Sequence, residues 1–320
     1  MFIAIDEVGN EIEAIHASRS KKYYCPVCQS EVIVKRGDIK IAHFSHQNIN
    51  MCERYLYRRE SPLHLKLKNN LYLMLKPNYD VRLEYYLQEI EQIPDCLVEC
   101  SVALEIQLSK ISPSLIMDRT NGYKTLGIDV RWIHDDSGIV AKNDTIYLSH
   151  FQISTLNQFH LFTVDSETMT FYMYRVIGNV GGMRWRYEKK KISYHDLIRP
   201  VEDIYEFIKM DRVFIDNEIK RARMMRSVRN KTLSYLYLLQ LTADELPTLF
   251  MYLTPFERFI EEPQLEWKLY LYYHIKNKSF DYHAFLEYIT LRKVNTNLTS
   301  KDIANGLLYD FKKILRISNE

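Results

Sequence analysis

The sequence predicts an α/β protein in three parts, and three features of the 320-residue chain support this prediction. Residues 1–52 contain two hairpin patterns, which join strands expected at 2–6 and 11–15 and at 31–34 and 39–44. Residues 53–200 follow the order helix, three strands, helix, strand. Residues 201–320 show helical periodicity. We therefore expect a small β module, a mixed-sheet α/β core and a C-terminal all-α domain.

Composition places the chain among ordinary globular proteins, with 47% apolar and 26% charged residues. The net charge is only +2, so any surface that binds nucleic acid must be local. Five cysteines with one CxxC pair suit a reducing compartment. No apolar run is long enough to cross a membrane, and the first residues lack the layout of a signal peptide. We expect a cytoplasmic protein without membrane contact.

Metal-binding residue types surround the second hairpin of the N-terminal module. Cys25-Pro-Val-Cys28 precedes this hairpin and His43-Phe-Ser-His46 follows it. Ligand pairs on both sides of a hairpin bring four side chains together, as in small zinc modules. We predict a structural Zn²⁺ site formed by Cys25, Cys28, His43 and His46. The interval between the histidines is shorter than usual, so Cys52 is an alternative fourth ligand. Two reduced thiols near two unrelated histidines are the remaining interpretation.

A helix is predicted to begin near residue 59, because Ser61-Pro62 suits a helix N-terminus and leucines recur along an apolar stripe. Glu60, His64 and Lys68 are spaced four residues apart and so share another face of this helix. Taken alone, this spacing favours a solvated stripe. The alternative is that Glu60, with His64, points at a metal ion.

Two short strands joined by a tight turn are predicted around residue 100. On the second strand, apolar and polar residues alternate, which places Glu105 and Gln107 on one face. If Val98 pairs with Val102 across a three-residue connection, Asp95 lies opposite Glu105. Two carboxylates a few ångströms apart form an oxygen-lined site for a divalent cation. A two-residue loop would turn Asp95 to the wrong face.

The neighbouring elements complete the expected core. A strand is predicted at 80–87, before the strand pair, and Ser112-Pro113 opens a helix that runs to about residue 126. Arg119 and Tyr123 lie four residues apart on one face of that helix. A strand at 128–134 follows, and a right-handed crossover would lay it parallel to a neighbour.

These motifs resemble the PD-(D/E)XK nuclease superfamily and, more closely, the competence protein CoiA family. The likeness lies in the CPVC and HFSH pairs, in ESPLHLKLK, and in PD…LEIQLSKIS…DRTNGYKTLGIDVRWI, and it covers roughly the first half of the chain. It implies a restriction-endonuclease-like core with the element order αβββαβ. Asp95 and Glu105 resemble the Mg²⁺ or Mn²⁺ ligands, and Glu60 resembles the acid of the first helix. Gln107 stands where the superfamily usually has lysine, so it can orient a water molecule but adds no charge.

The resemblance implies a nuclease or processing factor that acts on single-stranded or branched DNA during recombination in natural transformation. Arg119 and Tyr123 would position the DNA backbone or a splayed base. The alternative is a weak or inactive nuclease fold that binds single-stranded DNA and delivers it to a recombinase. A pure partner-binding scaffold is a third interpretation.

A second region has residue types suited to DNA. Residues 181–191 mix basic and aromatic side chains, which neutralise phosphates and stack on bases, respectively. Arg184, Arg186 and Lys189 are therefore candidate DNA-binding residues. An exposed, charged hairpin tip is an equally good interpretation of the same stretch.

Overall fold

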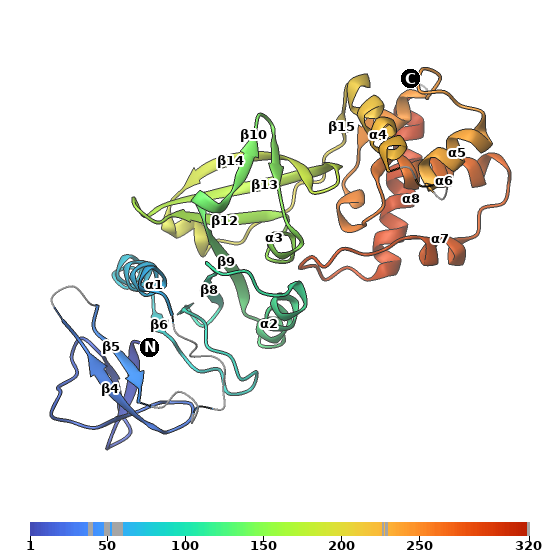
Figure 1. Ribbon diagram of the computed structural model, residues 1–320. Helices are drawn as coiled ribbons and strands as arrows, with labels where there is room; N and C mark the ends of the chain where they lie inside the picture. The colour runs from blue at the N-terminus through green and yellow to red at the C-terminus, as the bar shows by residue number, and fades with distance from the viewer. Residues whose placement is uncertain (38–40, 48–51, 53–59, 226, 228–229, 319–320) are drawn as a thin grey trace. The chain divides into compact units, whose positions relative to one another are not determined.

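The computed structural model describes residues 1–37, 41–47, 52, 60–225, 227 and 230–318 (Figure 1). The chain divides into two compact units. Unit 1 comprises residues 1–138, 161–173 and 190–200, and unit 2 comprises residues 139–160, 174–189 and 201–320. Among the described residues, the helices are too short or too polar to cross a membrane.

The N-terminal part of unit 1 is a five-stranded sheet in the order β2-β1-β3-β4-β5. Its strands are β1 (Ile3–Asp6), β2 (Glu11–Glu13), β3 (Tyr23–Tyr24), β4 (Glu31–Lys35) and β5 (His43–His46). Both predicted hairpins form, β1 with β2 and β4 with β5. The second strand of the later hairpin begins at residue 43 instead of 39, and residues 38–40 lie outside the described residues.

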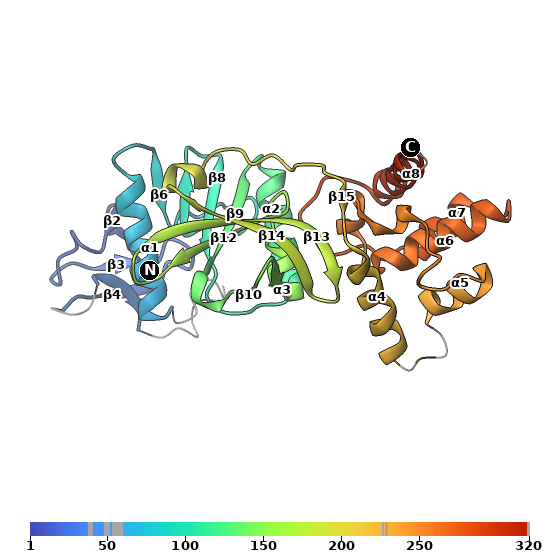
Figure 2. The same cartoon turned by 90° about the horizontal axis from the view of Figure 1, so that it is seen from above.

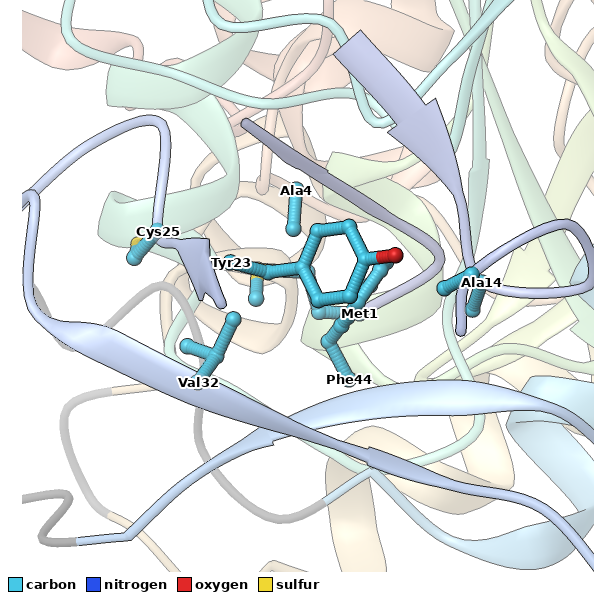
Figure 3. Close-up of a cluster of buried hydrophobic side chains, with 8 residues drawn as sticks. Met1, Ala4, Ala14, Tyr23, Cys25, Val32 and Phe44 are labelled. Atoms are coloured by element: carbon cyan, nitrogen blue, oxygen red, sulfur yellow. The ribbon is translucent and has the colours of Figure 1, made fainter. Parts of the chain in front are cut away.

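A small hydrophobic core holds this sheet together (Figure 3). The rings of Tyr23 and Phe44 pack with their centroids 5.1 Å apart. Met1, Ala4, Ala14, Cys25 and Val32 are also buried in this cluster. Cys25 thus belongs both to this core and to the predicted metal-binding set, so the core fixes one end of that set.

The rest of unit 1 has the predicted order helix, three strands, helix, strand. These elements are α1 (Pro62–Leu75), β6 (Val81–Leu83), β7 (Cys96–Val98), β8 (Val102–Ile106), α2 (Pro113–Thr125) and β9 (Asp129–Asp135). Strands β6, β7 and β8 are antiparallel, and β9 is parallel to β8, as a crossover through α2 predicts. Helix α1 packs on β6 and β8 (Figure 2), and α2 packs on β9 (Figure 1).

The register of the central strands decides between the two connections considered for their turn. Val98 lies opposite Val102, so the connection has three residues. Glu99 and Cys100 both take left-handed φ angles, 49° and 51°. One step beyond the Cys96–Leu104 pair, this register sets Asp95 across from Glu105. On its other side, Asp95 lies across from Glu84, whose N–H donates to the Asp95 carbonyl at 3.2 Å.

Further strands extend the sheet to the order β10-β11-β14-β13-β12-β9-β8-β7-β6. They are β10 (Val140–Lys142), β11 (Thr145–Tyr147), β12 (His160–Asp165), β13 (Thr170–Gly181) and β14 (Arg184–Ile192), with the short helix α3 (His150–Ser154) before β12. Gly181 and Gly182, at φ 111° and 60°, turn β13 into β14. The basic and aromatic stretch is therefore mainly a strand and not a loop. Trp185 is fully buried there, so it has no exposed face on which a base can stack.

Residues 201–320 are mainly helical, as predicted, but they are not all-α. Their helices are α4 (Arg212–Met224), α5 (Lys231–Leu239), α6 (Gln264–Lys276), α7 (Tyr282–Tyr288) and α8 (Ser300–Ile317). A two-stranded sheet, β15 (Ile208–Lys209) with β16 (Tyr252–Leu253), is added to them. Two short 3-10 helices, Thr248–Met251 and Phe256–Phe259, also lie in this region, and two others lie earlier in the chain at Asp136–Gly138 and Tyr194–Leu197.

Candidate functional site

The first turns of α1 carry one side of a buried acidic site. The Ser61 side chain caps the helix by accepting the His64 N–H at 3.1 Å, and Pro62 occupies the first turn. The helix spacing then aligns His64 and Lys68, whereas Glu60 lies just before the Ser61 cap, outside the helix. The solvated stripe favoured by the spacing alone is wrong, because the Lys68 side chain is buried, with only 1% of the residue exposed.

Asp95 contacts both helix α1 and strand β8. Its carboxylate accepts hydrogen bonds from the Ile106 N–H at 2.8 Å and from His64 Nε2 at 3.0 Å, and it lies 3.4 Å from Lys68 Nζ. Burial raises the pKa of Asp95, but the Lys68 charge and the His64 hydrogen bond outweigh it, so the net pKa is well below the usual range. Asp95 is therefore ionised at neutral pH.

Lys68 joins three carboxylates. Its ammonium group donates to Glu60 and to Glu84 Oε1, the latter at 2.5 Å, and forms the ion pair with Asp95 described above. Burial lowers the Lys68 pKa, but the three carboxylates raise it more, so lysine stays charged. Glu84 Oε2 accepts the backbone N–H groups of Phe2 and Ile3. The sequence interpretation assigned no role to Lys68 or Glu84, although both lie at positions that helix spacing and strand register specify.

Glu105 is held by α2 rather than left free in the site. Glu105 Oε1 accepts hydrogen bonds from Arg119 and from the Tyr123 hydroxyl, the latter at 2.5 Å. Burial raises the Glu105 pKa, Arg119 opposes this shift, and the nearby Asp95 charge adds to it. Tyr123 is fully buried, so in this conformation it has no surface with which to stack on a base. The guanidinium of Arg119 also lies over the Trp132 ring, 5.0 Å from its centroid.

The other predicted site residues lie apart from these contacts. The Gln107 side-chain amide donates to the Ser109 carbonyl at 2.5 Å, just after β8 ends. Arg184 is exposed on β14, and the Arg186 guanidinium lies 3.9 Å from the Asp144 carboxylate. The Lys189 ammonium lies 4.9 Å from the Tyr174 ring centroid.

Three side chains in the acidic site lie close enough together to bind one cation. One oxygen or nitrogen atom from each of Glu60, His64 and Asp95 lies within 4.8 Å of the others. Carboxylates suit Mg²⁺ and Mn²⁺, and an imidazole adds affinity for transition metals. Glu105 is not part of this three-residue group; it adjoins it through the strand register and through its electrostatic interaction with Asp95.

The charges of the site also favour a cation. Its four carboxylates are only partly balanced by Lys68 and Arg119, and by the Met1 ammonium group 3.4 Å from Glu60. One negative charge remains when His64 is neutral. Burial lowers the His64 pKa, but the hydrogen bond and charge of Asp95 raise it more, so the net pKa is raised. A proton on His64 and a metal ion therefore compete for the remaining negative charge, because His64 binds a metal only when it is neutral.

A second candidate metal cluster lies in the N-terminal sheet. Ligand atoms of Cys25, Cys28, His46 and Cys52 all lie within 4.8 Å of one another, and Cys28 Sγ is 3.3 Å from His46 Nε2. Burial raises the Cys25 pKa to about 12. Burial also raises the Cys28 pKa, but hydrogen bonds from Ser30, His46 and Cys52 outweigh it and lower the pKa to about 6.

The predicted ligand set with His43 needs correction, and the Cys52 alternative fits the geometry. His43 and His46 both lie on β5, three residues apart. Side chains alternate along a strand, so residues three apart point to opposite faces. His43 Nδ1 instead forms a hydrogen bond with the Ile41 carbonyl at 2.8 Å.

Comparisons with known proteins agree with this division into two clusters. The family model described as competence protein CoiA, nuclease-like domain, matches residues 60–199, and the model described as competence protein CoiA, N-terminal domain, matches residues 8–55. Together these two models cover more than half of the chain. The chain belongs to the competence protein CoiA family. The CoiA nuclease-like match contains the whole acidic site from Glu60 to Tyr123, and the CoiA N-terminal match contains the four residues of the Cys/His cluster.

A curated CoiA relative is also similar to this chain. Competence protein CoiA of Bacillus subtilis (strain 168) is 34% identical over 144 residues. The alignment covers 43% of this chain and 38% of the relative, so the chain matches well under half of that protein's length. No solved structure matches the chain.

Proposed function

We propose that this chain is a Mg²⁺- or Mn²⁺-dependent nuclease or DNA-processing factor that acts on single-stranded or branched DNA during recombination in natural transformation, in the cytoplasm. The observation that carries the proposal is the partly buried group of Glu60, His64 and Asp95, whose ligand atoms lie within 4.8 Å of one another. Membership of the CoiA family and the nuclease-like match over these residues support it. The order α1, β6, β7, β8, α2, β9 supports a restriction-endonuclease-like core of the PD-(D/E)XK type.

Each residue has a proposed role in phosphodiester hydrolysis. Glu60, His64 and Asp95 hold the cation, which supplies a water of lowered pKa and neutralises phosphate charge. Glu105 adds a third carboxylate beside those of Glu84 and Asp95 on the neighbouring strands. Arg119 and Tyr123 hold the Glu105 carboxylate in place and are not proposed to contact DNA. Gln107 orients water at the end of β8. Arg184, Arg186 and Lys189 are proposed to contact DNA phosphates, because they are cationic side chains on a largely exposed strand.

A cleavage assay tests this proposal. Purified protein is incubated with single-stranded, duplex and branched DNA in Mg²⁺ or Mn²⁺, beside Asp95→Asn, Glu60→Gln and the control Glu89→Gln, which changes an exposed glutamate of unit 1. We expect cleavage by the wild type and the control only. Intact DNA in every wild-type reaction, or cleavage that survives Asp95→Asn, contradicts the proposal.

Two features of the site favour a second function. Position 107 is a neutral amide, and the adjacent Asp95 and Glu105 are already paired with internal cations. Such a site suits a catalytically weak fold that binds single-stranded DNA and delivers it to a recombinase. DNA binding without cleavage, retained in Asp95→Asn, would favour this function over hydrolysis.

We also propose that Cys25, Cys28, His46 and Cys52 hold a structural Zn²⁺ ion. Four protein ligands of this type suit a closed tetrahedral site with no open position for water. Elemental analysis of purified protein tests it: one zinc per chain is expected for the wild type and for His43→Ala, and much less for His46→Ala. A folded wild-type sample without zinc contradicts the proposal.

A further inference from the structure

A charged lysine lies beneath the proposed metal ligands. Lys68 is 1% exposed, whereas the side chains of Glu60, His64 and Asp95 keep 19%, 22% and 10% of their surface. The opening of the site is therefore at these three residues, with the ammonium group behind them. Lysine is rarely buried to this degree, because removing its charge from water is costly. A hydrophobic residue at this position would avoid that cost, so the charge itself needs an explanation.

The position of Lys68 relates it directly to the proposed ligands. Its ammonium group contacts Glu60 and lies 3.4 Å from an Asp95 oxygen, so it touches two of the three residues that would hold the cation. A DNA phosphate brought to that cation is itself negative, and it approaches a site with four carboxylates. Fixed positive charge in a buried site stabilises negative charge that develops during phosphate hydrolysis. The neutral side chain of Gln107 contributes no positive charge.

Glu84 holds Lys68 in this position because its two carboxylate oxygens accept hydrogen bonds from different partners. Oε1 accepts the Lys68 ammonium at 2.5 Å, and Oε2 accepts the N–H groups of Phe2 and Ile3 at the start of β1. The Glu84 backbone takes a left-handed φ of 52°, which is unfavourable for a glutamate. Strain of this kind persists where surrounding contacts enforce it, often at functional sites. The backbone at the start of the N-terminal sheet thus fixes the Glu84 carboxylate, which in turn fixes the Lys68 ammonium group.

We infer that Lys68 supplies fixed positive charge directly behind the proposed metal ligands Glu60 and Asp95, where it favours a bound phosphate, and that Glu84 is the residue that positions it. This inference rests on the proposed phosphodiester chemistry. Lys68 acts through the ligands and does not touch the substrate, so it is a positioning residue in the same sense as Glu84. The positive charge of Lys68 should favour binding of an anionic DNA phosphate and disfavour binding of a metal cation, so these two effects have opposite signs.

That opposition defines the experiment. In Lys68→Gln, the loss of a cation beside the ligands should leave Mn²⁺ affinity unchanged or tighter by calorimetry, while the DNA cleavage rate at saturating Mn²⁺ falls about 100-fold. Glu84→Gln should lower kcat about tenfold without changing KM. Lys66→Gln, on the same helix but exposed, is the matched control and should match the wild type. A purely structural role predicts instead that metal affinity and cleavage fall together.

Two further measurements keep the test decisive. The double variant Lys68→Gln/Glu84→Gln removes one charge of each sign, so it should fold even if the single variant Lys68→Gln does not. Its rate of DNA cleavage should remain low. If the wild type cleaves no DNA, the proposed function fails, and Ca²⁺-dependent DNA binding then decides the inference. About tenfold weaker binding by folded Lys68→Gln supports it, and unchanged binding overturns it. Cleavage within twofold of the wild type, or faster, also overturns it.

Discussion

The ion pair that holds Glu105 provides a quantitative test of the structure. Glu105 is 5% exposed, and both Arg119 and Tyr123 donate to the same carboxylate oxygen. Arg119→Met removes the cation and leaves a buried carboxylate with one hydrogen bond. Breaking a buried pair in this way costs about 3–5 kcal/mol of unfolding free energy. Tyr123→Phe removes one hydrogen bond to a charged group and should cost about 1.5–3 kcal/mol.

Urea denaturation of the single and double variants measures these costs. Glu105→Gln/Arg119→Met removes both charges, so the double variant should be clearly more stable than the sum of the two single losses predicts. Arg199→Met is the matched control, because the Arg199 side chain is 73% exposed in its pair with Asp196, and it should cost less than about 1 kcal/mol. A cost for Arg119→Met equal to this control, or strict additivity in the double variant, would refute the buried pairing.

Three other predictions follow from individual residues. Cys100→Gly should stabilise the protein by about 1 kcal/mol in urea denaturation, because glycine takes the left-handed φ of 51° without a steric cost, and a loss of stability would contradict the turn geometry. Burial raises the Asp310 pKa to about 7, against the opposing Phe256 N–H hydrogen bond, so stability should fall as pH rises from about 4 to 7. In Asp310→Asn this fall should shrink, by up to the order of 4 kcal/mol at full ionisation, and an unchanged pH profile would count against it. Arg258→Leu should cost about 3–5 kcal/mol, since it leaves the carboxylate of Asp203 buried without its two guanidinium bonds at 2.9 and 2.7 Å; a loss below about 1 kcal/mol in the same assay would argue against a buried pair.

The parts of the fold that depend on local periodicity were predictable from the sequence. Alternation along residues 102–108 set the face of Glu105, and the three-residue connection between Val98 and Val102 set its partner as Asp95. The same antiparallel register, continued to the preceding strand, also places Glu84 beside Asp95. Sequence reasoning missed Glu84 because its positive φ ends β6 early, and one residue with unusual backbone geometry leaves no repeating pattern.

Other features depend on contacts that a periodic pattern does not contain. The spacing of Glu60, His64 and Lys68 predicts a shared helix face, but it does not say whether water or carboxylates cover that face. Likewise, mixed basic and aromatic residues at 181–191 do not reveal that Trp185 is buried in the sheet. The exclusion of His43 was predictable in principle, because two residues three apart on a strand cannot point to the same side.

Anomalous X-ray scattering from Mn²⁺-soaked crystals of the full chain can locate the proposed ion. We expect an ordered Mn²⁺ ion bound by Glu60, His64 and Asp95, at about 2.0–2.3 Å from their ligand atoms, and its loss in Asp95→Asn. Saturating Mn²⁺ with no ordered ion at these three residues, or an ion that persists there in Asp95→Asn, would contradict it.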